Sequence, residues 1–178
     1  MKRMKELVGR ELKWIQPRAT ARDFELKDGE ETVAMLEFRS TFGSLAAATT
    51  AEGRWSFKRV GFWTPHVTIR PADTETEIAL FRNRTWSAGG TLVLPNAEPI
   101  RANTNFWQTA FDFIDERDQP LVRYRKVGGM FHLSSLVEIT PQGAGLELLP
   151  WLVPFGWYLA IKMRDDASGA AAAAAAAG

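Results

Sequence analysis

Eight basic residues are the strongest candidates for binding chemistry in this sequence. They are Arg54, Lys58, Arg59, Arg82, Arg84, Arg123, Arg125 and Lys126. All of them fall in or beside segments rich in aromatic residues, so a surface shared by them would bind an anionic lipid headgroup or another phosphate-bearing ligand. The competing interpretation is that these basic residues lie on a solvated outer wall of the fold, where acidic neighbours balance their charge. With 22 basic and 21 acidic residues the net charge is +1, which favours the balanced wall unless the charges are segregated.

The two histidines offer little chemistry. Neither His66 nor His132 has a metal-ligand partner two or four residues away, and the two are far apart in sequence. A metal or acid–base role therefore stays an alternative to ordinary strand or loop positions, which we favour. The chain has no Cys, so thiolate metal sites and Cys nucleophiles are excluded.

An acidic cluster is the second candidate for a cation site. It consists of Asp112, Asp115, Glu116 and Asp118. Several carboxylates suit a hard cation, but the regular ligand spacing of a calcium loop is missing, so a solvated hairpin turn is the favoured interpretation. The sequence also lacks a P-loop, a G-x-S-x-G motif and an H-E-x-x-H motif. We therefore expect no catalytic residue, no metal and no cofactor.

The elements that must position these residues are mostly strands. In the segment 54–59, Trp55 and Phe57 share one face while Arg54, Ser56 and Lys58 share the other, as in a half-buried strand. Similar segments recur between turn signals at roughly 8–12-residue spacing, which is typical of an antiparallel barrel or sandwich. The expected strands are 11–16, 21–27, 32–39, 44–50, 53–60, 66–71, 77–82, 90–95, 98–102, 105–114, 119–126 and 133–140. Of these, 44–50 is Ala-rich and has a helix as its alternative.

The segment 146–163 differs from everything before it. Its apolar residues cover every side of a helical wheel, so the helix needs apolar surroundings all round. A bilayer or the interior of the protein's own barrel would provide them. Crossing a bilayer takes about 20 apolar residues, whereas the clean run here is shorter and contains Pro150 and Pro154. A large barrel also leaves central space that wall side chains cannot fill. We predict a closed antiparallel barrel of about twelve strands around a central C-terminal helix.

The two ends of the chain complete the predicted domain organisation. We expect a single domain over residues 1–164, followed by a polar and polyalanine tail over 165–178 that is a frayed helix or disordered. The basic start is not followed by an apolar run, so we expect no secretion signal and a cytoplasmic location.

This arrangement resembles the tubby C-terminal-like superfamily, which includes LURP-one-related proteins and phospholipid scramblases, and is most similar to small bacterial proteins of this type. The motifs that carry the resemblance are WSFKRVGFW at 55–63, GGTL at 89–92, NFW at 105–107, VEI at 137–139 and GWYL at 156–159. The resemblance implies a twelve-stranded barrel around a central helix. Tubby-type domains bind phosphoinositides through cationic side chains, but those positions do not match this sequence one by one, so the resemblance implies no site.

Three functions are compatible with these features. The favoured one is a non-catalytic binding or scaffold domain that contacts anionic lipid, or another anionic ligand, peripherally through the basic residues. The alternatives are a tail-anchored membrane protein that uses the segment 146–163, and a small enzyme with an unrecognised site. We expect no nucleic-acid partner. The aromatic residues lie on the strand face opposite the basic residues, so they pack in the core and are not available to stack on nucleobases.

Overall fold

The structure is a computed structural model of the whole chain, and it describes residues 1–40, 43–61, 63–85, 89–105, 110–128 and 133–177. In chain order the elements are η1 (Met4–Leu7), β1 (Leu12–Ile15), β2 (Asp23–Asp28), β3 (Glu31–Phe38), β4 (Ala46–Thr50), β5 (Arg54–Val60), β6 (His66–Pro71), β7 (Ala79–Thr85), β8 (Gly89–Leu94), β9 (Ala97–Thr104), β10 (Phe111–Ile114), β11 (Pro120–Gly128), β12 (Ser134–Ile139), η2 (Gly143–Gly145) and α1 (Leu149–Ala177).

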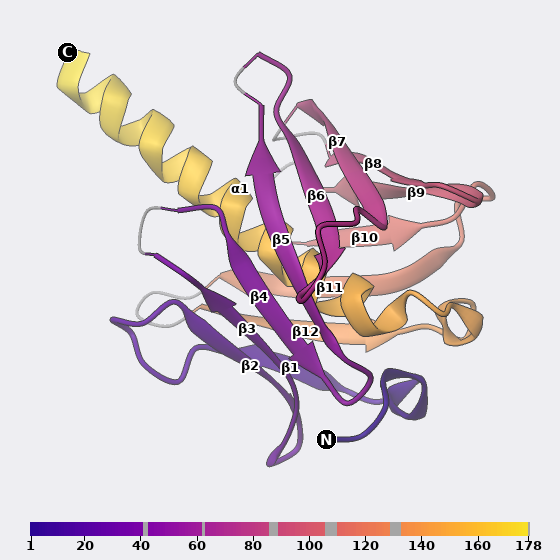
Figure 1. Cartoon of the computed structure of the whole chain (residues 1–178). Coiled ribbons are helices and arrows are strands. Elements are labelled where there is room, and N and C mark those ends of the chain that lie inside the picture. The colour runs from indigo at the N-terminus through magenta and orange to yellow at the C-terminus, as the bar shows by residue number, and fades with distance from the viewer. Residues whose placement is uncertain (41–42, 62, 86–88, 106–109, 129–132, 178) are drawn as a thin grey trace.

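The twelve strands form one closed barrel (Figure 1). Each strand pairs antiparallel with the next in sequence, and β1 pairs with β12, with Leu12 opposite Val137, to close the sheet. Closure leaves no unpaired strand edge. The predicted fold class, an antiparallel barrel of about twelve strands with one buried helix, is confirmed.

The observed strand boundaries differ most from the predicted ones at β10. The sequence pattern predicted a strand over 105–114, but β10 is only Phe111–Ile114, and residues 106–109 lie outside the described residues. Asn105 donates through its backbone N–H to the carbonyl of Ala110 at 3.1 Å, and its side-chain Oδ1 accepts from the N–H of Ala110 at 3.1 Å. These bonds make Asn105 and Ala110 the two ends of a connection. The Ala-rich segment, in contrast, is strand β4.

The helix α1 runs through the barrel (Figure 1), and every residue from Trp151 to Lys162 is buried. Pro150 lies in its first turn, where the N–H that proline lacks has no intrahelical partner in any case. Trp157 stacks on Trp14 of β1 with ring centroids 6.0 Å apart, and Phe155 packs against Phe57 of β5 at 5.2 Å. The helix that is apolar on every side therefore meets strands on every side.

The helix extends past the barrel. It continues to Ala177, beyond residue 163 where we expected it to end, and residues 167–176 are exposed. Of the two states expected for the polyalanine tail, the structure has a helix up to Ala177. Ala is the strongest helix former, so the run prolongs a helix that the barrel has already started.

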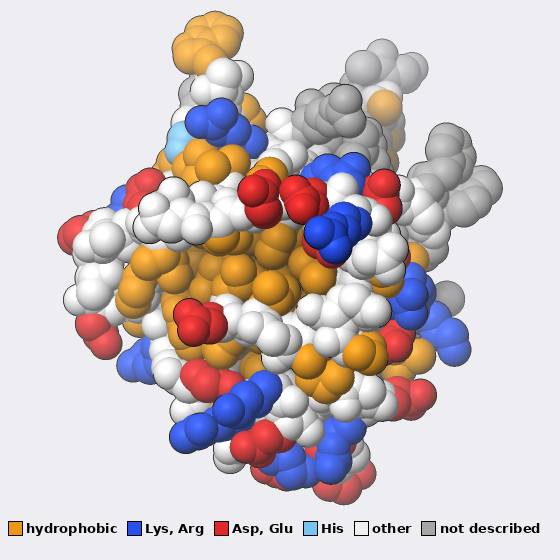
Figure 2. All heavy atoms as spheres, turned by 90° about the vertical axis from the view of Figure 1, so that its right-hand side faces the viewer, with side chains coloured by type: hydrophobic (Ala, Val, Ile, Leu, Met, Phe, Trp, Pro, Cys, Tyr) orange, Lys and Arg blue, Asp and Glu red, His pale blue; other side chains and the backbone are white. Residues whose placement is uncertain are grey.

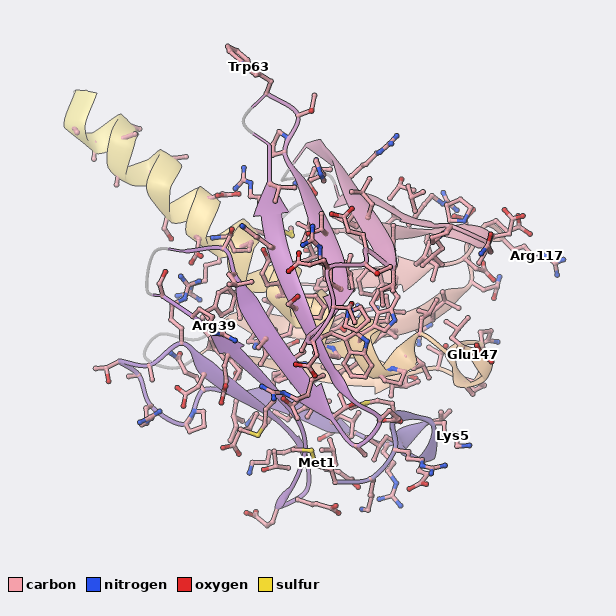
Figure 3. All side chains as sticks on the ribbon, viewed as in Figure 1. Met1, Lys5, Arg39, Trp63, Arg117 and Glu147 are labelled. Carbon is pink, nitrogen blue, oxygen red and sulfur yellow. The ribbon has the colours of Figure 1, made fainter. Side chains whose placement is uncertain are left out.

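The barrel has two distinct ends. At the helix-start end, the strands are joined by the connections 29–30, 51–53, 72–78, 95–96 and 115–119, and η1 and η2 lie nearby. At the helix-exit end, the connections are 16–22, 39–45, 61–65, 86–88, 105–110 and 129–133. The C-terminus projects from the helix-exit end, and Met1 lies away from it (Figures 1 and 3).

Candidate anionic-ligand surface

The eight predicted site residues lie on two opposite walls of the barrel. Five of them belong to β5 and β7, and Arg123, Arg125 and Lys126 belong to β11. In the closed order of twelve strands, β5 and β11 are six positions apart in either direction. The structure therefore brings Lys58 and Arg82 onto one wall, on either side of β6, and separates them from the bases of β11.

Arg59 points toward the barrel interior, on the same face of β5 as the buried Phe57. Its guanidinium pairs with the carboxylate of Asp166 on α1, at 3.2 Å. Beside it, Arg22 pairs with Asp165 at 2.7 Å. Arg59 is thus part of the contact that holds α1 where the helix leaves the barrel.

The bases of β11 are mostly paired on the outer wall. Arg123 contacts Glu138 of β12 at 3.2 Å, and Arg125 donates through both terminal nitrogens to Asp112 of β10, the second bond measuring 3.0 Å. Lys126 is exposed and has a positive φ of 55°. These two arginines are paired with carboxylates on the outer wall, which is the charge-balanced arrangement that the net charge of +1 favoured.

Lys58 and Arg82 are exposed on the outer wall and, like Arg54 and Lys126, make no ion pair with any carboxylate that the structure describes; they differ in lying close together on one wall. Lys58 lies opposite Thr68 in β6, and Arg82 lies opposite His66 in the same strand. Their Cα atoms are thus two strands and two residues apart, about 12 Å in an ordinary sheet. Long flexible side chains at that spacing can both reach one anionic group.

A nearby base on the same wall is neutralised. Arg70 of β6 donates to Glu75 at 2.7 Å and to Glu77 at 2.7 Å. The hydrogen bond with Glu77 is the main reason that the pKa of Arg70 is raised above its ordinary value. Arg54, the remaining base of β5, is exposed at the helix-start end of that strand. Arg84 belongs to β7, but its side chain lies outside the described residues.

Trp63 was missed as a site residue by the sequence reasoning, which treated it only as part of a family motif. It lies at the tip of the connection between β5 and β6 (Figure 3), and 90% of its surface is exposed. Val60, at the end of β5, is paired with His66 at the start of β6. The flanking Gly61 and Pro65 are the signal in the sequence that could have placed Trp63 on a turn.

The weaker candidates take ordinary structural roles. The Oδ1 atom of Asp115 accepts hydrogen bonds from the backbone N–H groups of Arg117 at 2.9 Å and Gln119 at 2.8 Å, and Asp118 pairs with Arg101 at 2.6 Å. These are the contacts of a hairpin turn. Nδ1 of His66 lies 3.2 Å from the carbonyl of Thr64, whereas His132 lies outside the described residues.

The barrel interior is filled where the structure describes it. A cavity of about 10 Å³ lies between α1 and the strands β7 to β10, beside Asn83, which is room for about one water molecule. Burial raises the pKa of Tyr124 and of Tyr158 above the ordinary value of 10.0. Within the described ranges, no three His, Asp or Glu side chains gather into a metal site.

The helix-start end has an apolar hollow. Figure 2 faces this end and shows hydrophobic side chains gathered near its centre, with acidic and basic side chains mixed around them. Partly buried hydrophobic residues at this end include Trp55, Ile78, Leu94 and Leu148. The hollow is therefore a recess over the core, and its rim has no single charge sign.

Two further findings bear on the assignment. None of the helices in the part of the chain that the structure describes is long and apolar enough to span a bilayer. No protein family, no curated protein and no solved structure matches the chain.

Proposed function

We propose that the protein is a non-catalytic binding domain that docks on anionic lipid headgroups at the cytoplasmic face of a membrane, without inserting a helix. The observation that carries the proposal is the pair Lys58 and Arg82, two exposed cations on one wall without a described acidic partner. Bases near an anionic bilayer contribute about 1 kcal/mol each to binding. The comparable arginines Arg123 and Arg125 are already paired with carboxylates.

Two other features support a binding role. The filled barrel has little internal room for a substrate beside the described core residues. The titratable side chains that converge where α1 leaves the barrel pair with one another, as in Arg22–Asp165, Arg59–Asp166 and Lys162–Asp165. The barrel around a central helix also supports the resemblance to the tubby C-terminal-like superfamily, some of whose members bind lipid. The superfamily assignment remains part of the proposal.

Vesicle co-sedimentation tests this function directly. The full chain is mixed with vesicles of phosphatidylcholine alone, or of phosphatidylcholine with phosphatidylserine. We expect binding only to the anionic vesicles, weakening as salt is added. The double variant Lys58→Gln/Arg82→Gln should bind about thirty-fold more weakly, since two bases at about 1 kcal/mol each are lost.

The matched control is Arg123→Gln/Arg125→Gln, which removes the same charge from the opposite wall. It should bind within about three-fold of the unaltered chain, because these two arginines lie on the opposite wall and are already paired with Glu138 and Asp112. The proposal is overturned if both double variants bind equally weakly, or if binding does not depend on phosphatidylserine. Recovery of the protein only in detergent would instead favour the tail-anchored alternative.

A further inference from the structure

The connections at the two ends of the barrel differ in charge. Those at the helix-start end contain eight acidic residues and one basic residue, Arg117. The acidic residues are Glu30, Glu52, Asp73, Glu75, Glu77, Asp115, Glu116 and Asp118. In sequence, the six connections at the helix-exit end contain no Asp or Glu, and they contain Arg18, Arg22 and Arg39. The connections at the two ends therefore differ in charge although the net charge of the chain is near zero. The segment around η1 adds Arg3 and Lys5 at the helix-start end, and Arg18 and Arg22 at the helix-exit end are paired with Asp23 and Asp165.

Aromatic residues have the opposite distribution. The five connections at the helix-start end contain no Phe, Trp or Tyr. In sequence, five of the six connections at the helix-exit end contain Phe or Trp. Those residues are Phe42, Phe62, Trp63, Trp86, Phe106, Trp107 and Phe131. Of these residues, Trp63 is the one that the structure describes.

The backbone of the 61–65 connection presents Trp63 outward. Gly61 has a φ of 84°, a conformation that favours glycine, and a Cβ there would lie 2.8 Å from the carbonyl oxygen of Thr64. The tight turn therefore depends on glycine, and it leaves Trp63 90% exposed. Trp is suited to the boundary between headgroups and acyl chains, where its ring is partly in apolar surroundings and its N–H meets polar groups.

From this polarity we propose that the helix-exit end is the membrane-contacting end, with Trp63 inserted among the headgroups of an anionic bilayer. This inference rests on the proposed function. It adds the orientation of the barrel on the membrane and an apolar contact made by Trp63. Arg39 is exposed at the same end and makes no ion pair with a described carboxylate, and Arg82 lies opposite the first residue of β6. The helix-start connections, with eight acidic residues and one basic residue, face away, because an anionic surface repels them.

Site-specific fluorescence distinguishes the two ends. The chain contains no Cys, so Thr64→Cys and Arg117→Cys each create one labelling site for the fluorophore NBD without removing Trp63. Both positions are exposed, and Figure 3 shows Trp63 and Arg117 on different parts of the molecule. On vesicles of phosphatidylcholine and phosphatidylserine, the label at 64 should shift to the blue and resist an aqueous quencher, whereas the label at 117 should do neither.

A binding measurement complements the label. Trp63→Ala should weaken vesicle binding at least about ten-fold, since a partly buried indole contributes well over 1 kcal/mol. Val93→Ala, on an outer-wall residue that is 37% exposed, is the matched control and should leave binding unchanged.

The outcomes separate the two proposals. If the unlabelled chain does not sediment with anionic vesicles, the proposed function itself is overturned. If it sediments but the label at 117 shifts, or neither label shifts, the orientation is wrong while the function stands. If Trp63→Ala changes the mass of the protein in solution without vesicles, the residue serves self-association instead, and the inference is overturned.

Discussion

The ring of Tyr124 occupies the space that a side chain at Gly156 would fill. This close approach allows the hydroxyl of Tyr124, in β11, to donate to the carbonyl of Val153 in α1 at 2.6 Å. The contact joins the barrel wall to the backbone of the central helix. It also explains the Gly in the GWYL motif, since any other residue would push β11 away from α1.

Gly156→Ala should therefore destabilise the protein by about 1–3 kcal/mol, the usual cost of overpacking a core. Urea denaturation followed by circular dichroism measures this change. Gly169→Ala is the matched control in the same helix, because a Cβ there meets nothing within 4 Å. It should be neutral or slightly stabilising, and an equal loss in both variants would contradict the role of Tyr124.

The two tyrosines predict the alkaline limit of stability. Both are buried, and burial raises the pKa of each hydroxyl above its ordinary value of 10.0 in the folded protein. The unfolded chain releases these protons near pH 10, so the stabilisation is complete below that pH and is lost as pH rises further. The chain has only these 2 Tyr, so phenolate absorbance should appear together with unfolding. Phenolate formation in the folded protein would contradict this prediction.

The acid limit depends on carboxylates near the N-terminus. A hydrogen bond from Lys2 lowers the pKa of Asp28 below its ordinary value of 3.8, and a hydrogen bond from Lys27 lowers that of Glu25 below 4.5. The stabilisation is therefore present above these values and is lost as pH falls through the folded-state pKa. Asp28→Asn should be less stable than the unaltered chain at pH 7, and the difference should disappear as the pH falls through the lowered pKa of Asp28 in the folded protein. Denaturation curves across this pH range test this.

The ion pairs at the helix exit should contribute measurably to stability. Arg22 and Asp165 have side chains 18% and 36% exposed, so water screens their interaction only in part. A double-mutant cycle on Arg22→Ala and Asp165→Asn should give a coupling energy near the upper end of the 0.2–1 kcal/mol range for partly exposed pairs. The control pair Arg18 and Asp23, with Arg18 71% exposed, should give less. Equal couplings would contradict this ranking.

Much of the architecture could be predicted from the sequence because hydrophobic periodicity reports which face of each strand is buried. In β5, Phe57 is buried and Trp55 partly buried, while Arg54 and Lys58 on the other face are exposed as expected, and the apolar segment before Met163 lies inside the barrel. The end of α1 could not be predicted in the same way, since the residues after 163 have no apolar face and are helical through continuation of the buried segment.

The candidate site was harder to predict because charge pairing depends on register. Arg125 lies 13 residues from Asp112, and only the pairing of β10 with β11 brings them together. Arg59 could have been recognised from the sequence alone, because it shares the parity of Phe57 and therefore points inward. The exposure of Trp63 depends on how its turn projects, which periodicity does not report.

The central position of α1 also constrains biosynthesis. The residues that fill the middle of the barrel, Trp151 to Lys162, are buried against strands that precede them in the chain. Translation therefore produces all twelve strands before the element around which they close. A nascent chain that does not yet include α1 has no complete core, so the last folding step waits for the synthesis of α1, and nascent strands need protection from aggregation until then.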